Sequence, residues 1–124
     1  MGTVLLFHVN IFQANQIAGI CQKLQLTTKS ISREEYQKPL SVLAGITEQS
    51  QKTKNSNLYT YSGPELEHEM MVFSGMDSTD LDCFLEEYTK AGIAPIPRKA
   101  ILTSSNILWT PLRLYRELDE HTKQ

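Results

Sequence analysis

The C-terminal half of the chain holds the densest group of side chains that could bind a ligand, namely Lys99, Thr103, Asn106 and Trp109. Residues 103–106 join an expected strand to an expected helix, so that hydroxyl groups, an amide and a helix N-terminus meet at one corner. Such groups bind small anions. We therefore expect an anion site at this corner. The same residues could instead serve only the corner itself, with Asn106 or Thr110 capping the helix and Thr103 completing the turn.

Trp109 shares a stripe of the last helix with Arg113 and Arg116. An indole ring on such a stripe can stack with a guanidinium group or contact another protein. We therefore predict a partner contact formed by Trp109, Arg113 and Arg116 if the ring is exposed. The commoner alternative is a partly buried ring that covers the edge of the core.

No group of residues has the spacing of a catalytic or metal site. Cys83 lies on a helix rich in aspartate and glutamate, whose negative field disfavours a thiolate, and Cys21 lies on an apolar helix face as a small core residue. The three histidines, His8, His68 and His121, lack the spacing of metal ligands. We therefore predict no catalytic residue, no metal and no cofactor.

Composition indicates one small folded domain spanning residues 1–124. The chain has 124 residues, 40% of them hydrophobic, which is enough to bury a core without disulfides or metals. With 12 basic and 14 acidic residues, it lacks the positive field that attracts nucleic acids or anionic lipids. A strand-like start without a charged leader, and the lack of about 18 consecutive apolar residues, predict a cytoplasmic protein.

The chain repeats one pattern of strand, helix and strand. The halves span residues 3–46 and 70–122, and a polar segment, 47–69, is expected to join them as a mobile connection. The expected strands are residues 3–9, 27–31, 70–74 and 98–103. The expected helix ends are caps at Asn10 and Asp77, stops at Gly45 and Gly92, and a capping box formed by Ser32 and Glu35.

The polarity of the four strands predicts their order. The first and third are apolar and should lie side by side, antiparallel, whereas the second and fourth are polar enough for sheet edges. We therefore predict an α+β fold: a ferredoxin-like, split βαβ arrangement with a four-stranded antiparallel sheet and an extra helix after each half. The alternative is a doubly wound α/β sheet. In the preferred fold, residues 8–10 and 74–77 lie at opposite ends of the sheet and cannot form one pocket.

Residues 71–120 resemble a bacterial family known as domain of unknown function 3783. The most specific part is the spacing Lys-Ala-x-x-Thr-x-x-Asn-x-x-Trp, which begins at Lys99 and ends at Trp109. The strand residues 72–75 and the helix from Leu81 to Ala91 add to the resemblance, and residues 39–45 carry it more loosely into the first half. The resemblance implies no activity and no catalytic residues, but it favours the four corner residues as a set.

Three functions remain open from the sequence. The leading hypothesis is a non-enzymatic binding or regulatory module, which forms a homo-oligomer through a sheet edge or a helix and binds a small anion or a protein at the Lys99 to Trp109 corner. The second is a small hydrolase or transferase that uses Lys99 and Asn106, with His8 as a further candidate. The third is a weak single-stranded RNA binder that stacks bases on Phe7 and Phe73.

Overall fold

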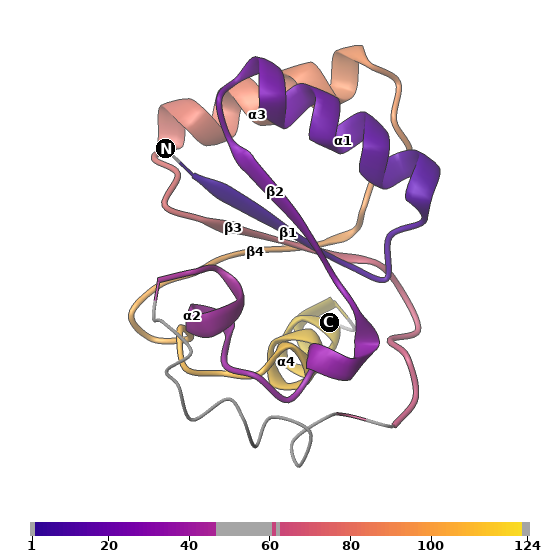
Figure 1. The fold of residues 1–124 in the computed structure, drawn as a ribbon, viewed down its shortest axis with the longest axis vertical. Coiled ribbons are helices and arrows are strands. Elements are labelled where there is room, and N and C mark those ends of the chain that lie inside the picture. The colour runs from indigo at the N-terminus through magenta and orange to yellow at the C-terminus, as the bar shows by residue number, and fades with distance from the viewer. Residues whose placement is uncertain (1, 47–60, 62, 123–124) are drawn as a thin grey trace.

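The computed structural model describes residues 2–46, 61 and 63–122, and the predicted mobile connection falls largely outside these ranges, at residues 47–60. Two βαβ units follow one another along the chain (Figure 1). The elements are β1 (Thr3–Phe7), α1 (Ile11–Lys23), β2 (Thr27–Ile31), the 3-10 helix η1 (Arg33–Glu35), α2 (Leu40–Leu43), β3 (Met70–Ser74), α3 (Ser78–Lys90), β4 (Arg98–Ile101) and α4 (Pro111–Thr122).

The sheet has the strand order β2-β1-β3-β4. The apolar strands β1 and β3 are antiparallel neighbours at its centre, with Thr3 opposite Ser74 and Phe7 opposite Met70. This confirms the predicted central and edge strands. It also confirms that the turns after β1 and β3 lie at opposite ends of the sheet.

The predicted ferredoxin-like, fully antiparallel sheet is wrong. β1 pairs directly with β2 and β3 with β4, in both cases parallel, so that the sheet is mixed and neither βαβ unit is split. The all-parallel alternative is also wrong, because β1 and β3 are antiparallel. The physical reason is that strand polarity separates central from edge strands. It does not select which central strand each edge strand joins, so the split arrangement was not distinguished from the one observed.

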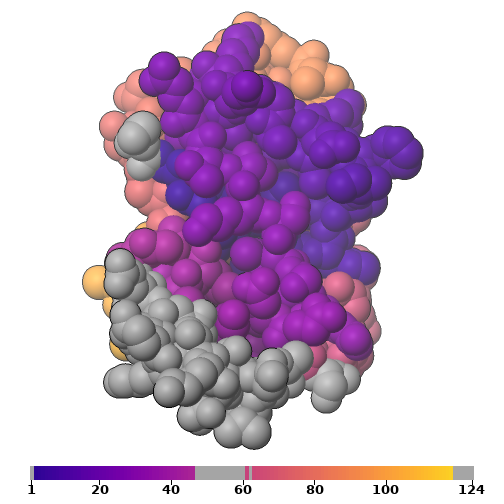
Figure 2. Space-filling view, viewed as in Figure 1, coloured from indigo at the N-terminus to yellow at the C-terminus, as the bar shows by residue number. Residues whose placement is uncertain are grey.

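Helices cover both faces of the sheet and give three layers (Figure 1). Val4 and Leu6 of β1 face α1 and α3, where they pack with Phe84, whereas Leu5 and Phe7 face the side of α2 and α4. Alternate residues of a strand point to opposite faces, so a central strand covered twice must be apolar throughout. In the space-filling view, the N-terminal half forms most of the face turned to the viewer (Figure 2).

Most of the predicted helix ends are confirmed. The Asn10 side chain accepts a hydrogen bond from the Gln13 amide at 2.8 Å, and that of Asp77 accepts one from the Asp80 amide at 2.8 Å. Gly45 and Gly92 have positive φ angles, 80° and 72°, in the left-handed conformation that ends a helix.

The capping box predicted at Ser32 and Glu35 is wrong, whereas one of the two caps predicted for the last helix is confirmed. Ser32 makes no capping hydrogen bond with its side chain, and instead of one regular helix the chain forms η1 and then α2. Pro39 explains the break, because it disfavours helical backbone at the preceding residue. The last helix begins at Pro111, and the Thr110 hydroxyl accepts a hydrogen bond from the Arg113 amide at 3.2 Å, so Thr110 and not Asn106 is its cap.

Within the described residues, no helix combines the length and the apolar character needed to cross a membrane.

Candidate functional site

The structure shows how the predicted corner from Lys99 to Trp109 is held together. The Asn106 side chain accepts a hydrogen bond from the Thr103 amide at 2.9 Å and donates one to the Ile101 carbonyl at 3.1 Å. The Thr103 hydroxyl accepts a hydrogen bond from the Ser105 amide at 3.2 Å. These side chains therefore complete the turn after β4. This is the structural role that the sequence offered as the alternative to an anion site.

The corner residues do not converge on one pocket. The Lys99 ammonium group donates a hydrogen bond to the Ile96 carbonyl at 2.8 Å. Lys99 also lines an apolar groove with Phe73 and Leu85, on the α3 side of β4. Trp109 packs against the core on the opposite, α4 side of the sheet. The anion site at these residues stays a prediction, and the structure separates two of its four members.

Trp109 is half-buried and lies under a guanidinium group, because the Arg113 Cζ atom is 4.2 Å from the ring centroid. Its carbonyl accepts a hydrogen bond from the Leu40 amide at 2.8 Å, and the Ile107 carbonyl accepts one from the Ser41 amide at 2.9 Å. The segment from Ile107 to Trp109 thereby provides hydrogen-bond acceptors for the first two backbone amides of α2. Arg116 is exposed. The partner contact of Trp109, Arg113 and Arg116 stays a prediction.

A cavity of about 360 Å³ lies at the carboxyl ends of the parallel strands β1 and β2. Ligands of open α/β sheets bind at such strand ends. The polar residues that line the cavity are His8, Asn10, Ser30, Glu65 and Glu69. The apolar ones are Leu6, Val9 and Ile31. We call this cavity the strand-end pocket.

Glu65 is held in place by two donors. One of its carboxylate oxygens accepts hydrogen bonds from the Tyr36 hydroxyl and from the Leu66 amide, the latter at 2.9 Å. Tyr36 is fully buried, and burial together with the Glu65 carboxylate raises the pKa of its phenol well above the usual value. The hydroxyl therefore remains a donor throughout the physiological range. The second Glu65 oxygen lies 3.6 Å from Nδ1 of His8.

His8 occupies an unusual backbone conformation at the rim of the strand-end pocket. Its φ angle of 63° lies in the left-handed region, which costs most residues other than glycine about 1–2 kcal/mol. Asn10 caps α1 two residues later, so the helix N-terminus also lies beside the pocket. The next two side chains, Ile11 and Phe12, are 66% and 80% exposed. Polar groups and exposed apolar groups therefore adjoin at this end of the sheet.

Sequence reasoning considered His8 but missed Glu65, Glu69 and Ser30. Because Phe7 lies opposite Met70, continuation of the antiparallel register places Glu69 opposite His8. This signal was available, since the antiparallel pairing was itself predicted. The same topology places His8 at the end of the sheet where β4 begins, whereas Asn106 follows the end of β4. A catalytic group that combines Asn106 with His8 is therefore not formed.

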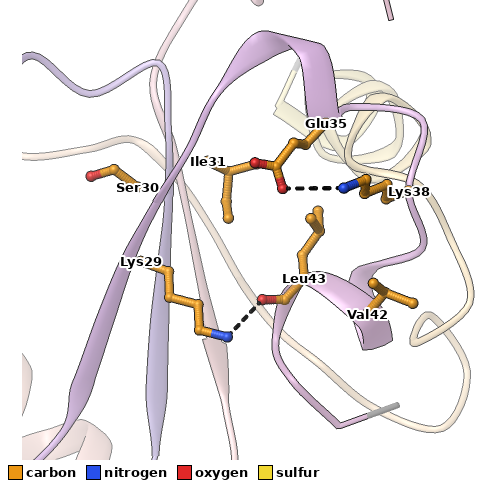
Figure 3. A pocket seen from close by; sticks show the side chains of 7 residues that line it. All are labelled: Lys29, Ser30, Ile31, Glu35, Lys38, Val42 and Leu43. Carbon is orange, nitrogen blue, oxygen red and sulfur yellow. Dashed lines mark hydrogen bonds and ion pairs between the residues drawn. The ribbon is translucent and has the colours of Figure 1, made fainter. Parts of the chain in front are cut away.

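A second cavity, of about 390 Å³, lies along the outer edge of β2 (Figure 3). We call it the β2-edge groove. Lys29 reaches across it from β2, and its ammonium group donates a hydrogen bond to the Leu43 carbonyl at 3.3 Å. On the other side, the ammonium group of Lys38 lies 3.8 Å from the carboxylate of Glu35. Two lysines and one glutamate therefore stand around a groove whose apolar lining is Ile31, Val42 and Leu43.

The remaining sequence candidates lie as follows. Phe7 and Phe73 are buried, so neither ring is available on the surface for stacking with a base. Cys21 is buried, which raises the pKa of its thiol, and Cys83 is exposed. Among the residues that the structure describes, no three histidine, cysteine, aspartate or glutamate side chains are grouped so that they could hold a metal ion.

The protein is a three-layer α/β domain made of two βαβ units around a mixed sheet. A family model, described as a domain of unknown function (DUF3783), matches residues 69–123, so this part of the chain is a DUF3783 domain. The resemblance of residues 71–120 is thereby confirmed, whereas that of residues 39–45 stays a prediction. The matched segment contains β3, α3, β4 and α4. The chain matches no curated protein and no solved structure.

Proposed function

We propose that the protein is a non-enzymatic binding module and that the strand-end pocket is its small-molecule site. The observation that carries this proposal is the convergence of His8, Glu65 and Glu69 on one cavity of about 360 Å³. His8 directly follows β1, Glu69 directly precedes β3, and Glu65 lies four residues before Glu69. A cavity of this size on which polar groups converge beside apolar side chains is typical of ligand sites.

The charges around the strand-end pocket favour a cationic ligand. Glu65 and Glu69 supply two carboxylates, and within the part of the chain that the structure describes no lysine or arginine lines the cavity. Glu65 is held by Tyr36 and Leu66 through one oxygen, which leaves the second directed toward His8. An ammonium group supplies the three donors that such carboxylates accept. We therefore expect a primary amine whose hydrocarbon part contacts the apolar wall.

Hexylammonium is a suitable probe, with hexanol and hexanoate as its neutral and anionic counterparts. In an NMR titration we expect hexylammonium to shift the amide signals around His8 and Glu69 and to bind most tightly of the three. Glu69→Gln should weaken binding roughly tenfold, because a charged acceptor is lost. Glu86→Gln changes an exposed carboxylate on α3 and should have no effect. Equal binding of hexanoate, or an unchanged affinity in Glu69→Gln, would contradict the proposal.

A hydrolase remains a second candidate because Ser30, His8 and Glu65 line the same cavity. A hydroxyl, an imidazole and a carboxylate are the groups of a serine hydrolase, in which the imidazole accepts the hydroxyl proton and the carboxylate orients the imidazole. The distance of 3.6 Å between Nδ1 of His8 and Glu65 favours this assignment. It differs from the sequence hypothesis, which used Lys99 and Asn106.

A fluorophosphonate probe distinguishes the two functions. If the protein is a hydrolase, the probe should label Ser30, and both Ser30→Ala and His8→Asn should abolish the labelling. His8→Asn is a mild change for the backbone, because asparagine tolerates the left-handed conformation. If the protein is only a binding module, no label should appear and His8→Asn should still bind hexylammonium. Mass spectrometry of the intact protein measures the outcome.

A further inference from the structure

The outer edge of β2 has backbone groups that pair with no strand formed by residues 2–46, 61 and 63–122. β2 is the first strand in the order β2-β1-β3-β4, so among the described strands it has one neighbour, β1. The Thr27 amide donates to the Gly2 carbonyl at 2.9 Å, which turns Thr27 toward β1. Because successive residues of a strand direct their amide and carbonyl to alternate sides, those of Thr28 and Ser30 point away from β1. An added strand could therefore pair with Thr28 and Ser30.

The β2-edge groove lies beside these backbone groups and has a defined chemistry (Figure 3). Val42 and Leu43 of α2 form an apolar wall, and Lys29 and Lys38 provide two ammonium groups. Both cations are weakly held: the Lys29 contact with a carbonyl is 3.3 Å long and the Lys38 ion pair is 3.8 Å long. A stronger acceptor could therefore recruit both. On a chain with a formal net charge of -2, this groove carries a local positive excess.

We propose that the β2 edge binds an extended acidic segment of a partner protein, which adds a fifth strand to the sheet and places carboxylates near Lys29 and Lys38. Strand addition takes its affinity from main-chain hydrogen bonds and its specificity from the pockets that receive alternate side chains. This groove offers two ammonium groups to the side chains that point toward it, and in an alternating segment those are the acidic ones. The proposal does not depend on the strand-end pocket.

Charge favours a partner protein over a second copy of this chain. In a symmetric dimer through β2, the Lys29 and Lys38 side chains of both copies would face the same seam. Like charges at such positions oppose pairing. An acidic segment replaces this repulsion with attraction.

A fluorescently labelled peptide of alternating glutamate and valine tests the proposal by fluorescence anisotropy. We expect it to bind the full chain, and a peptide of alternating lysine and valine to bind far less. A peptide of alternating glutamate and proline has the same charge but lacks the amides that a strand must donate, so it should also bind far less. Equal binding of the glutamate–proline peptide would overturn strand addition.

Charge reversal locates the site. Lys29→Glu and Lys38→Glu should each weaken binding of the glutamate–valine peptide roughly tenfold. Lys90→Glu makes the same charge change at an exposed position on α3 and should leave the affinity unchanged. Lys29→Gln serves as a milder variant if the reversal disturbs folding, which circular dichroism monitors, and it should weaken binding in the same direction.

Three outcomes would overturn the proposal. The first is no binding of the glutamate–valine peptide at low salt, and the second is equal affinity in Lys29→Glu and Lys90→Glu. The third is a concentration-dependent dimer in sedimentation that Lys29→Glu alters, because it would make a second copy the occupant of the edge. Glu69→Gln should not change peptide binding, so failure of this proposal is distinguishable from failure of the strand-end pocket.

Discussion

Replacement of Phe84 with alanine should lower the free energy of unfolding by about 3–5 kcal/mol. Phe84 is fully buried between α3 and the sheet. Its ring centroid lies 5.5 Å from that of Phe73 and 5.9 Å from that of Tyr88. Truncation removes apolar area and these ring contacts and leaves a cavity that rigid neighbours fill only in part. Urea denaturation monitored by circular dichroism measures the change.

Cys83 provides the matched control for Phe84, because it is the preceding residue of the same helix and is exposed. Cys83→Ala should change the free energy of unfolding by no more than about 0.5 kcal/mol. A similar loss for both variants would show that α3 packs with a different face toward the sheet.

Replacement of Tyr36 with alanine should also cost about 3–5 kcal/mol and should impair the strand-end pocket as well. The ring is fully buried on the opposite side of the sheet and lies 6.0 Å from Phe7. Its hydroxyl donates to Glu65. Without it, Glu65 loses a donor that fixes its position, so hexylammonium should bind more weakly. Denaturation and the NMR titration measure the two effects separately.

Tyr36→Phe is the control that keeps the ring and removes only the hydroxyl. It should lower the free energy of unfolding by about 1.5 kcal/mol, since one hydrogen bond to a charged acceptor is lost while the packing is retained. Hexylammonium binding should fall in this variant as well. If Tyr36→Phe is as unstable as Tyr36→Ala, the hydrogen bond rather than the ring dominates, contrary to our expectation.

The sequence by itself determined most of the secondary structure and which strands lie at the centre and at the edges of the sheet. Val4 to Phe7 and Met70 to Phe73 are apolar at every position, which only a strand covered on both faces requires. Thr27 to Ile31 and the start of β4 are polar, which suits an edge. Asn10, Asp77 and Gly92 act within one turn of the chain, so their roles as helix ends could be predicted locally.

The sequence did not determine how each βαβ unit is closed. Polarity distinguishes central from edge strands, but it does not tell which edge strand lies beside which central strand. The split and unsplit arrangements place the same residues in the core. Direct parallel pairing of β1 with β2, and of β3 with β4, is therefore a property of the tertiary structure.

The candidate site depended on the tertiary structure even more strongly. The resemblance around Lys99 and Trp109 could be recognised from spacing, yet the two residues lie on opposite faces of the sheet, because the chain turns between them. His8, Glu65 and Glu69 show no local spacing. The antiparallel register places Glu69 opposite His8, and hydrogen bonds from Tyr36 and Leu66 hold Glu65 at the same cavity. Helix caps depend on residues within one turn of the chain, and strand polarity can be read directly from the sequence. A pocket made of distant segments, in contrast, forms only once the strands have paired.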